Sequence, residues 1–576
     1  MQDATASPQV DRFLVVTHAS ASLDSAVLEG RRADWTSATG QVVAWLWPPE
    51  APPQADGGLE LRLGDPGPAR DTFVDIDIDR AGRGTVRQDE FGLAPLYVAT
   101  LDAFSFVSNR PDLIALAQER IVGQWPERDS AFAALLAFKG FPMGDRTGYA
   151  GVRCVPFLAH VQVSGSGARI VAASSPPWVP SRPASTSDLA DAVDELEASA
   201  TVRLRQVADR VPRGVGRPRL ELTGGRDSRL VLALAVRSGT IDGFDVVTYT
   251  GQPDDVRVAR QVAASANARH LIEDRPPVAD DPFERVRTTS GALNLSEAHR
   301  RNPRSVPATV VSGLLGETLS SNFPSTAPLG TRGQVLRAFI EPPNLDLLTA
   351  PAWEAAVAET MQLLLTPLAQ GAGTEDLLDA FYLQHRVRRW ISVRPEAFSG
   401  TAFPLYCPPA ARLAFALGWQ ARVEHRIHSA IVERAGRGIA EVPYASAKRA
   451  GEPSPATIAY PEDGPPVLDA EPLKRIARDW RDRRRRWQLP DVTANPDPAR
   501  EGAALAGRHG SPARLALYRD IVNADAWNPA FEVIDRERLL SAVRVLPMLP
   551  SHLAKQVHAA MASVIWLGRM EGNAFA

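Results

Sequence analysis

A glycine-rich turn near the middle of the chain constrains the fold more than any other segment. It reads Thr223-Gly224-Gly225-Arg226-Asp227-Ser228 and lies between a strand-like stretch, 219–222, and a helix-like stretch, 230–236. Two adjacent glycines let a ligand approach the backbone, and the N-terminus of a helix presents unpaired N–H groups and a partial positive charge. The turn therefore suits an anion such as a phosphate chain, although a tight turn with a polar helix cap explains the same residues.

The turn lies within a repeating pattern of strands and helices. It is neither a Gly-x₄-Gly-Lys-Ser/Thr loop nor a Gly-x-Gly-x-x-Gly fingerprint. Strand-like stretches recur at 244–249 and 306–312, and a helical pattern covers 256–264. This alternation predicts a parallel α/β sheet, and from about residue 375 the pattern becomes mainly helical.

The first third of the chain has a different character. Short apolar runs that read as strands alternate with turn residues, and the predicted strands are 13–16, 42–47, 72–78 and 104–107. A proline-rich stretch, 176–183, ends this pattern, and apolar residues then recur at three- and four-residue steps over 189–207, as on one face of a helix. We therefore place a domain boundary near residue 180.

Composition excludes several classes of protein. A chain of 576 residues with a net charge of −3 predicts two to four domains and argues against a protein that coats nucleic acid or anionic membrane. The arginine-rich stretch 481–486 is interpreted as a solvated helix face. No apolar run approaches the length of a membrane span, so we expect a cytoplasmic protein without membrane or nucleic-acid partners. A homo-oligomer is compatible with the sequence.

Cysteine and histidine give little sign of a metal site. Cys154 and Cys407 are the only cysteines, too few for a disulfide framework or a four-cysteine zinc site, and we expect both to be buried thiols. His425 and His428 lie three residues apart on a predicted helix, but no third ligand accompanies them. We expect this helix face to lie on the surface.

The glycine-rich turn resembles the Ser-Gly-Gly-x-Asp-Ser pyrophosphate loop of ATP pyrophosphatases, with Thr223 at the first serine. The stretch 248–251, followed by Asp254 and Asp255, resembles the second strand and helix of asparagine synthetases. More loosely, 311–317 resembles their Ser-Gly-Glu-Gly-Ala-Asp-Glu segment. In that alignment Glu317 takes the aspartate position, and Thr318 replaces a second acid.

The first third resembles the class II glutamine amidotransferase domain of the same family. The stretch 88–97 is similar to its Arg-Asp-x-x-Gly-x-Arg-Pro-Leu-Tyr-Tyr segment, and 106–113 and 146–152 are similar to later parts of that domain. The chain thus resembles asparagine synthetases and their relatives, the β-lactam synthetases and lasso peptide macrolactam synthetases. The resemblance implies an Ntn-hydrolase-like α+β sandwich over 1–180. Over 181–576 it implies an α/β parallel-sheet ATP pyrophosphatase domain with a largely helical C-terminal part.

The resemblance also implies an activity and a site. Members of the family adenylate a carboxylate with ATP and Mg²⁺, and an amine then attacks the acyl-adenylate. The implied catalytic residues are Asp227, Glu317, Tyr382, Glu396 and Lys448, of which Asp227 and Glu317 would hold Mg²⁺. The implied ATP- and pyrophosphate-binding residues are Leu222, Thr223, Gly224, Gly225, Arg226, Asp227, Ser228, Thr248, Gly313 and Lys448.

Plainer interpretations of these residues stay open. Glu317 is also explained as a helix-capping or solvent-facing acid, and Lys448 as a solvated loop lysine. A tyrosine–glutamate pair deprotonates the amine in lactam-forming relatives, and Tyr382 with Glu396 is the candidate pair here.

The glutamine-hydrolysing parts of the family are missing from this sequence. The family nucleophile is a cysteine that follows the initiator methionine, whereas residue 2 here is Gln2, and no Asn-Gly dipeptide is present for the oxyanion element. We therefore expect a degenerate first domain. The carboxylate substrate is a small molecule or a peptide. Three hypotheses remain: amide formation without glutamine hydrolysis, including lactam or macrolactam closure; asparagine synthesis from ammonia; or a catalytically silent ATP- or partner-binding protein.

Overall fold

The computed structural model describes most of the chain: residues 12–19, 23, 27–28, 31–47, 57–64, 73–172, 174–179, 185, 187–210, 217–250, 252–274, 283, 286, 310–321, 329–341, 345–391, 401–445, 458–483, 512–524, 528–549 and 551–568. The expected boundary at residue 180 lies outside the described residues, as do residues 306–309 of the expected strand 306–312.

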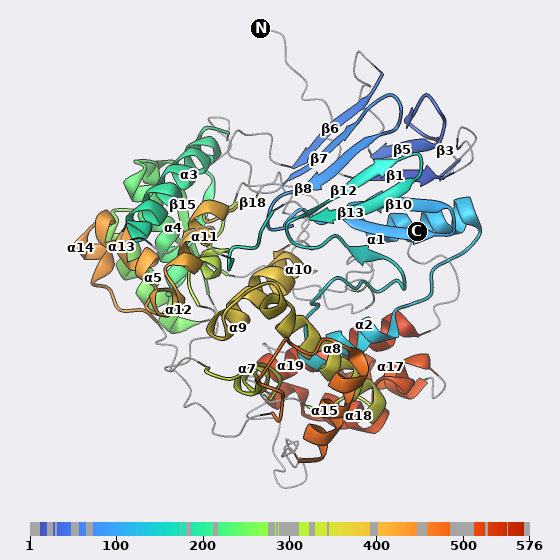
Figure 1. The fold of residues 1–576 in the computed structure, drawn as a ribbon. Helices are drawn as coiled ribbons and strands as arrows, with labels where there is room; N and C mark the ends of the chain where they lie inside the picture. The colour runs from blue at the N-terminus through green and yellow to red at the C-terminus, as the bar shows by residue number, and fades with distance from the viewer. Residues whose placement is uncertain are drawn as a thin grey trace.

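Two antiparallel sheets form the N-terminal part (Figure 1). The six-stranded sheet has the order β11 (Arg153–Cys154), β9 (Tyr97–Leu101), β10 (Phe104–Ser108), β1 (Arg12–His18), β5 (Val42–Trp47) and β4 (Trp35–Thr36). The five-stranded sheet has the order β13 (Gly167–Ala172), β12 (Ala159–Ser164), β8 (Gly84–Gln88), β7 (Phe73–Ile78) and β6 (Leu59–Gly64). A short ribbon pairs β2 (Val27–Leu28) with β3 (Arg31–Arg32). The four strands predicted from the sequence correspond to β1, β5, β7 and β10.

Alternation along β1 explains why the two sheets stack. Phe13 and Val15 share a buried apolar cluster with Ile76 and Val161 of the second sheet. Leu14 and Val16 point to the opposite face of β1 and join the core that the helices complete. The six-stranded sheet is therefore covered on both faces, by the second sheet on one side and by helices on the other.

A parallel five-stranded sheet follows in the chain. Its order is β16 (His270–Glu273), β15 (Asp245–Tyr249), β14 (Arg219–Glu221), β17 (Val310–Val311) and β18 (Thr401–Ala402), and neighbouring strands in this order pair in parallel. The helices associated with it are α3 (Asp188–Arg210), α4 (Arg226–Arg237), η2 (Ile241–Gly243) and α5 (Pro253–Ser265). The predicted parallel α/β arrangement is confirmed.

The strand order has a reversal at β14. From β14 the chain moves through α4 to β15 on one side, and it later returns to place β17 on the other side. In open parallel sheets such a switch point leaves a crevice at the carboxyl ends of the strands, where ligands bind. The segments that follow β14 and β17 therefore meet at this crevice.

The rest of the chain is mainly helical, as predicted. Its elements are η3 (Gly316–Thr318), α7 (Arg332–Ile340), α8 (Ala350–Ala369), η4 (Thr374–Asp376), α9 (Leu377–Phe381), η5 (Tyr382–Val387), α10 (Arg388–Ile391), α11 (Pro408–Ala416), α12 (Trp419–Val423), α13 (Arg426–Ala435), α14 (Arg437–Ala440), α15 (Ala470–Arg483), α17 (Pro512–Ala524), η7 (Pro529–Glu532), α18 (Arg536–Val545), η8 (Leu546–Met548) and α19 (Ser551–Leu567).

Arg481 of α15 was expected on a solvated helix face, but it is largely buried against α8. Its guanidinium lies 2.6 Å from Glu354 of α8, and only 19% of its side chain is exposed. The neighbouring Trp480 packs on Trp353, so this side of α15 is an intramolecular interface.

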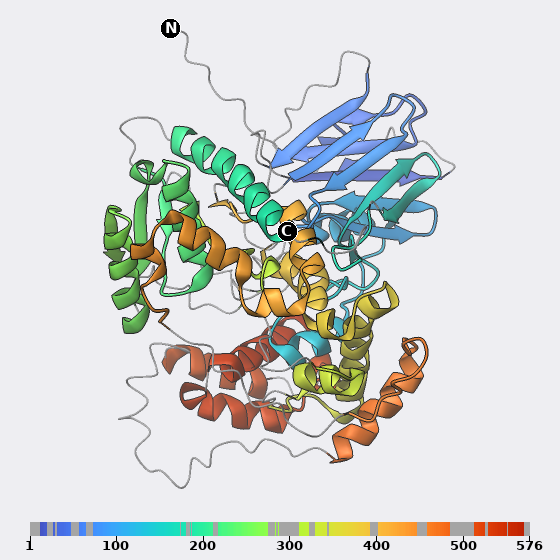
Figure 2. The same ribbon diagram turned by 60° about the vertical axis from the view of Figure 1, so that its left-hand side comes forward.

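The N-terminal part also contains three helical segments, α1 (Pro111–Ala117), η1 (Gln118–Val122) and α2 (Ser130–Lys139). Helix α2 packs against both α8 and α19, which come from the C-terminal half of the chain. Figure 2 shows the red C-terminal helices, α19 among them, beside the cyan α2 and below the antiparallel sheets. The C-terminal helices thus complete the core beneath the N-terminal part.

Burial confirms one sequence expectation, and the helices bear on a second. Cys154 and Cys407 are free and buried, as predicted. Among the described helices, none is long and apolar enough to cross a membrane.

Trp566 of α19 gives a test of this packing. The indole is 2% exposed, its Nε1–H donates to the carbonyl of Gly148 at 2.8 Å, and its ring meets Tyr149 edge-on. We expect Trp566→Ala to lower the free energy of unfolding by about 3 kcal/mol, because it opens a cavity between the two halves of the chain. The denaturant midpoint measures the loss. Trp125→Ala, which removes an indole that is 45% exposed, is the matched control, and an equal loss in both variants would contradict the packing.

Candidate active site at the carboxyl ends of β14 and β17

The turn after β14 is held by hydrogen bonds between its own ends. The backbone N–H of Thr223 donates to Ser228 Oγ at 3.0 Å, and the two hydroxyl oxygens lie 3.0 Å apart. Gly225 is the N-cap of α4, and the Gly224 N–H donates to Asp255 Oδ1 at 3.2 Å. The first-turn N–H groups of α4 have no partner within the helix, so they form an anion-attracting end beside the crevice.

Two glycines let the segment after β17 pack directly on this turn. A Cβ added to Gly313 would lie 2.7 Å from the backbone nitrogen of Ser228. A Cβ added to Gly316 would lie 2.3 Å from Asp227 Oδ1. No side chain fits at either position, so the close approach of the two segments depends on glycine.

Asp227 lies in the first turn of α4 and is bonded to a histidine from α13. His428 Nε2 and Asp227 Oδ1 are 3.0 Å apart, so with an ionised Asp227 the imidazole N–H is the donor. The His428 side chain is 1% exposed, whereas that of Asp227 is 41% exposed. The expectation that His428 lies on a surface helix face is therefore wrong, because α13 turns this residue inward toward α4.

Glu317 lies next to Asp227 and receives a hydrogen bond from Tyr382. The phenol O–H of Tyr382 donates to Glu317 Oε1 at 3.0 Å. Burial and the nearby negative charge of Asp227 raise the pKa of Glu317 to about 7. Burial and Glu317 also raise the pKa of Tyr382 well above its ordinary value, so the phenol keeps its proton at neutral pH. Asp227, Glu317, Tyr382 and His428 thus form one connected cluster, and Glu317 is not a solvent-facing acid.

The cluster fits one Mg²⁺ ion that substrate phosphates would help to hold. Magnesium takes hard oxygen ligands and is usually held through one or two carboxylates, with waters and phosphates completing its shell. Asp227 and Glu317 supply two carboxylates whose mutual repulsion a divalent cation would relieve. Within the described residues there is no group of three or more His, Cys, Asp or Glu suited to a metal.

The remaining predicted nucleotide-binding residues differ in their burial and in their bonding partners. Leu222 is buried, and its N–H and C=O are bonded to Val247 and to the Thr248 hydroxyl. Thr248 also contacts His270 Nε2 at 2.8 Å, so its hydroxyl is engaged within the sheet. The Arg226 guanidinium lies 4.8 Å from the ring centre of Tyr444. Lys448 and Glu396 lie outside the described residues.

Sequence reasoning missed two residues of the site. Asp255, noted only as part of a family segment, anchors the glycine-rich turn from the start of α5. His428 lies three and four residues before Ile431 and Val432, and all three are buried on one face of α13. That helical spacing was a usable signal that His428 faces inward.

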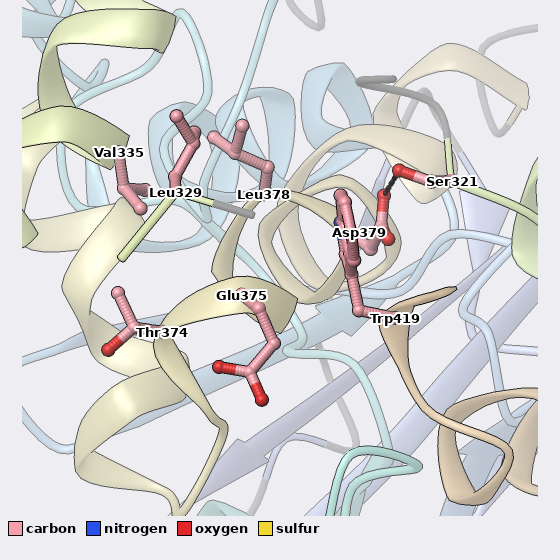
Figure 3. A pocket seen from close by; sticks show the side chains of 8 residues that line it. All are labelled: Ser321, Leu329, Val335, Thr374, Glu375, Leu378, Asp379 and Trp419. Atoms are coloured by element: carbon pink, nitrogen blue, oxygen red, sulfur yellow. Dashed lines mark hydrogen bonds between the residues drawn. The ribbon is translucent and has the colours of Figure 1, made fainter. Parts of the chain in front are cut away.

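A small pocket opens one helical turn before Tyr382 (Figure 3). It is lined by Ser321, Leu329, Val335, Thr374, Glu375, Leu378, Asp379 and Trp419. Inside it the Ser321 hydroxyl donates to Asp379 at 3.0 Å, and the buried guanidinium of Arg422 pairs with the same carboxylate at 3.3 Å. The Asp379 carboxylate is therefore engaged by a hydroxyl and a guanidinium.

No protein-family model matches the chain, and no curated protein sequence matches it. The functional argument consequently depends on the arrangement of its own residues.

The raised pKa of Glu317 predicts a pH-dependent stability. Between the ordinary carboxyl pKa of 4.5 and about 7, the unfolded chain releases a proton that the folded chain keeps, so stability falls as pH rises through this window and stays low above it. Glu317→Gln mimics the protonated acid. Without Mg²⁺ and ATP, we expect it to raise the denaturant midpoint above pH 7 and to change it little at pH 4.5.

Denaturant midpoints measured across this pH range, with Glu375→Gln as the control for an exposed carboxylate, test the prediction. A Glu317→Gln effect of equal size at all pH values would contradict the assigned protonation of Glu317.

Proposed function

We propose that the protein is an ATP-dependent, AMP-forming carbon–nitrogen ligase that adenylates a carboxylate for attack by an amine. The observation that carries the proposal is the meeting of two segments at the sheet's switch point. The glycine-rich turn supplies N–H donors, and Asp227 and Glu317 supply two adjacent carboxylates. This combination suits a polyanionic nucleotide bound with a divalent cation.

Each residue of the cluster has a role in this proposal. The turn 223–228 and the N-terminus of α4 bind the phosphates, while Asp227 and Glu317 would hold Mg²⁺. When bound, Mg²⁺ would neutralise charge on the phosphates and assist departure of pyrophosphate. His428 occupies one oxygen of Asp227 and fixes the orientation of its carboxylate. Lys448 keeps its proposed role of balancing phosphate charge.

Tyr382 acts in this proposal as a hydrogen-bond donor. Because its pKa is raised, the phenol retains its proton and orients Glu317 Oε1. A second proposed role for Tyr382 is to deprotonate the amine together with Glu396. Because the phenol is protonated at neutral pH, another group must first accept its proton before Tyr382 can act as a base.

We infer that the N-terminal sandwich is a degenerate, Ntn-hydrolase-like amidotransferase domain. Cys154 and Cys407 are both buried, and burial raises the pKa of the Cys407 thiol, which opposes formation of a nucleophilic thiolate. The nitrogen would then come from an amine substrate, including an amine on the same molecule in lactam or macrolactam closure, or from free ammonia as in asparagine synthesis.

Thr318 favours a second candidate function, a catalytically silent ATP- or partner-binding protein. This residue lies where the resembled family has a second acid, it is buried, and its hydroxyl donates to the Leu315 carbonyl at 2.7 Å. The retained Asp227–Glu317 pair favours the active alternative.

ATP–pyrophosphate exchange tests the adenylation step. We expect exchange with at least one member of a panel of amino acids, β-amino acids and peptides, and a loss of at least about 100-fold in Asp227→Asn, because the variant weakens the phosphate and cation site. Asp254→Asn is the matched control, since Asp254 is a mostly exposed acid at the start of α5.

The outcomes separate the candidate functions. Mg²⁺-dependent ATP binding without exchange would support the silent protein, and absence of nucleotide binding would exclude both enzyme hypotheses. Asparagine formation from aspartate and ammonia would identify the ammonia-dependent alternative.

Glutamine hydrolysis should be absent from the purified full-length protein. Both cysteines are buried, which limits the access of glutamine to either thiol. Glutamate release from glutamine is the measurement, with Cys154→Ser and Cys407→Ser as the variants to compare if any is detected. Glutaminase activity that either substitution removes would overturn the inferred role of the N-terminal part.

A further inference from the structure

We propose that Arg388 is a positioning residue through which the N-terminal sandwich fixes Tyr382 at the Asp227–Glu317 cluster. This inference rests on the proposed function. It gives the N-terminal part a structural role at the proposed site, whereas its buried cysteine does not suit glutamine hydrolysis. It concerns the helical run formed by α9, η5 and α10, which covers Leu377–Ile391 without interruption.

The helical run carries Tyr382 where its geometry changes. Tyr382 begins η5, a π-helical segment of six residues, and Arg388 begins the α-helical turn that follows. π-Helical segments are rare and occur often at functional sites, because the wider turn re-aims the side chains next to it. The position of the Tyr382 phenol therefore depends on how the end of this run is anchored.

Arg388 anchors that end in the N-terminal part. Its side chain is 1% exposed and makes five hydrogen bonds, which match the five N–H donors of a guanidinium. The Nε–H donates to Gln384 O at 3.0 Å, within the helical run itself. The other four bonds go to residues 144–155: Gly144 O at 3.2 Å, Asp145 Oδ1, Cys154 Sγ at 3.2 Å and Val155 O at 2.6 Å.

Neighbouring residues of the run face the same part of the molecule. The Arg386 guanidinium lies 4.0 Å from the ring centre of Phe141, and that of Arg389 lies 5.6 Å from the ring centre of Phe132. His385, immediately before Arg386 in the chain, is also buried. Consecutive residues of η5 and α10 are thus fixed by the N-terminal part, while Tyr382, at the other end of η5, reaches Glu317.

The chemistry of the contact explains why arginine is needed. A buried guanidinium is stable only when its charge is paired and its N–H groups are bonded. Asp145 supplies the charge and three further acceptors come from two carbonyls and a thiol. Lysine has three donors on a single nitrogen and cannot reproduce this planar set of contacts. Arg388→Lys should therefore retain the positive charge but lose the contacts that fix the orientation of the helical run carrying Tyr382.

A double-mutant cycle tests whether Arg388 acts through Tyr382. We expect Arg388→Lys and Tyr382→Phe each to lower kcat of ATP–pyrophosphate exchange by about 10-fold, since removing a partner of a metal-binding carboxylate costs about 10- to 100-fold. In the Tyr382→Phe background, Arg388→Lys should have no further effect on kcat. Independent, multiplicative losses would overturn the proposal, because they would show a general structural role.

A second measurement does not depend on activity. With 3-fluorotyrosine incorporated, the ¹⁹F resonance of Tyr382 is the one missing from the Tyr382→Phe spectrum. We expect Arg388→Lys to shift or broaden this resonance, and an unchanged resonance would overturn the proposal. If the wild-type protein shows no exchange, the proposed function fails while the ¹⁹F spectrum still tests the positioning role.

A matched control and a milder variant complete the design. Arg412 of α11 also reaches the N-terminal part, at Ser175 O and Glu90, but its helix carries no member of the cluster. Arg412→Met should leave the Tyr382 resonance unchanged. If Arg388→Lys fails to fold, Asp145→Asn removes only the charge partner and should shift the resonance in the same direction.

Discussion

The architecture of the site depends on two carboxylates that lie close together at one edge of a parallel sheet. Asp227 follows β14 and Glu317 follows β17, and the reversal of strand order brings these segments together. Gly316 permits the contact, because a larger residue would overlap the Asp227 carboxylate. Repulsion between the two acids is moderated on one side by His428 and on the other by Tyr382. We propose that a cation and a polyanionic nucleotide bind to this arrangement.

Side chains from the C-terminal half of the chain make direct contacts with the N-terminal part. Arg388 and Trp566 both insert into the N-terminal part from C-terminal helices. The Tyr406 hydroxyl accepts a hydrogen bond from the Glu90 N–H at 3.0 Å, and its ring packs against Phe91. The N-terminal sandwich, whose cysteine is buried, therefore contacts the helical run that carries Tyr382.

Local patterns predicted the elements well and their contacts poorly. The strands β1, β5, β7 and β10, the long helix α3 and the turn 223–228 all follow from hydrophobic periodicity and from glycine, whose effects operate over a few residues. His428 was expected at the surface, and Arg481 was expected in solvent, because a single helix does not show which of its faces another helix covers. Both residues are bonded to acids distant in sequence, Asp227 and Glu354.

The sequence by itself determined the order of strands and helices, the glycine-rich turn and the pair of segments from which a nucleotide site is proposed. Only the tertiary structure decided that Glu317 is held by Tyr382, that His428 orients Asp227, and that Arg388 ties the Tyr382 helix to the N-terminal sandwich. The reason is that these contacts join residues 65 to 244 positions apart. Their partners, burial and pKa values come from packing that no local pattern encodes.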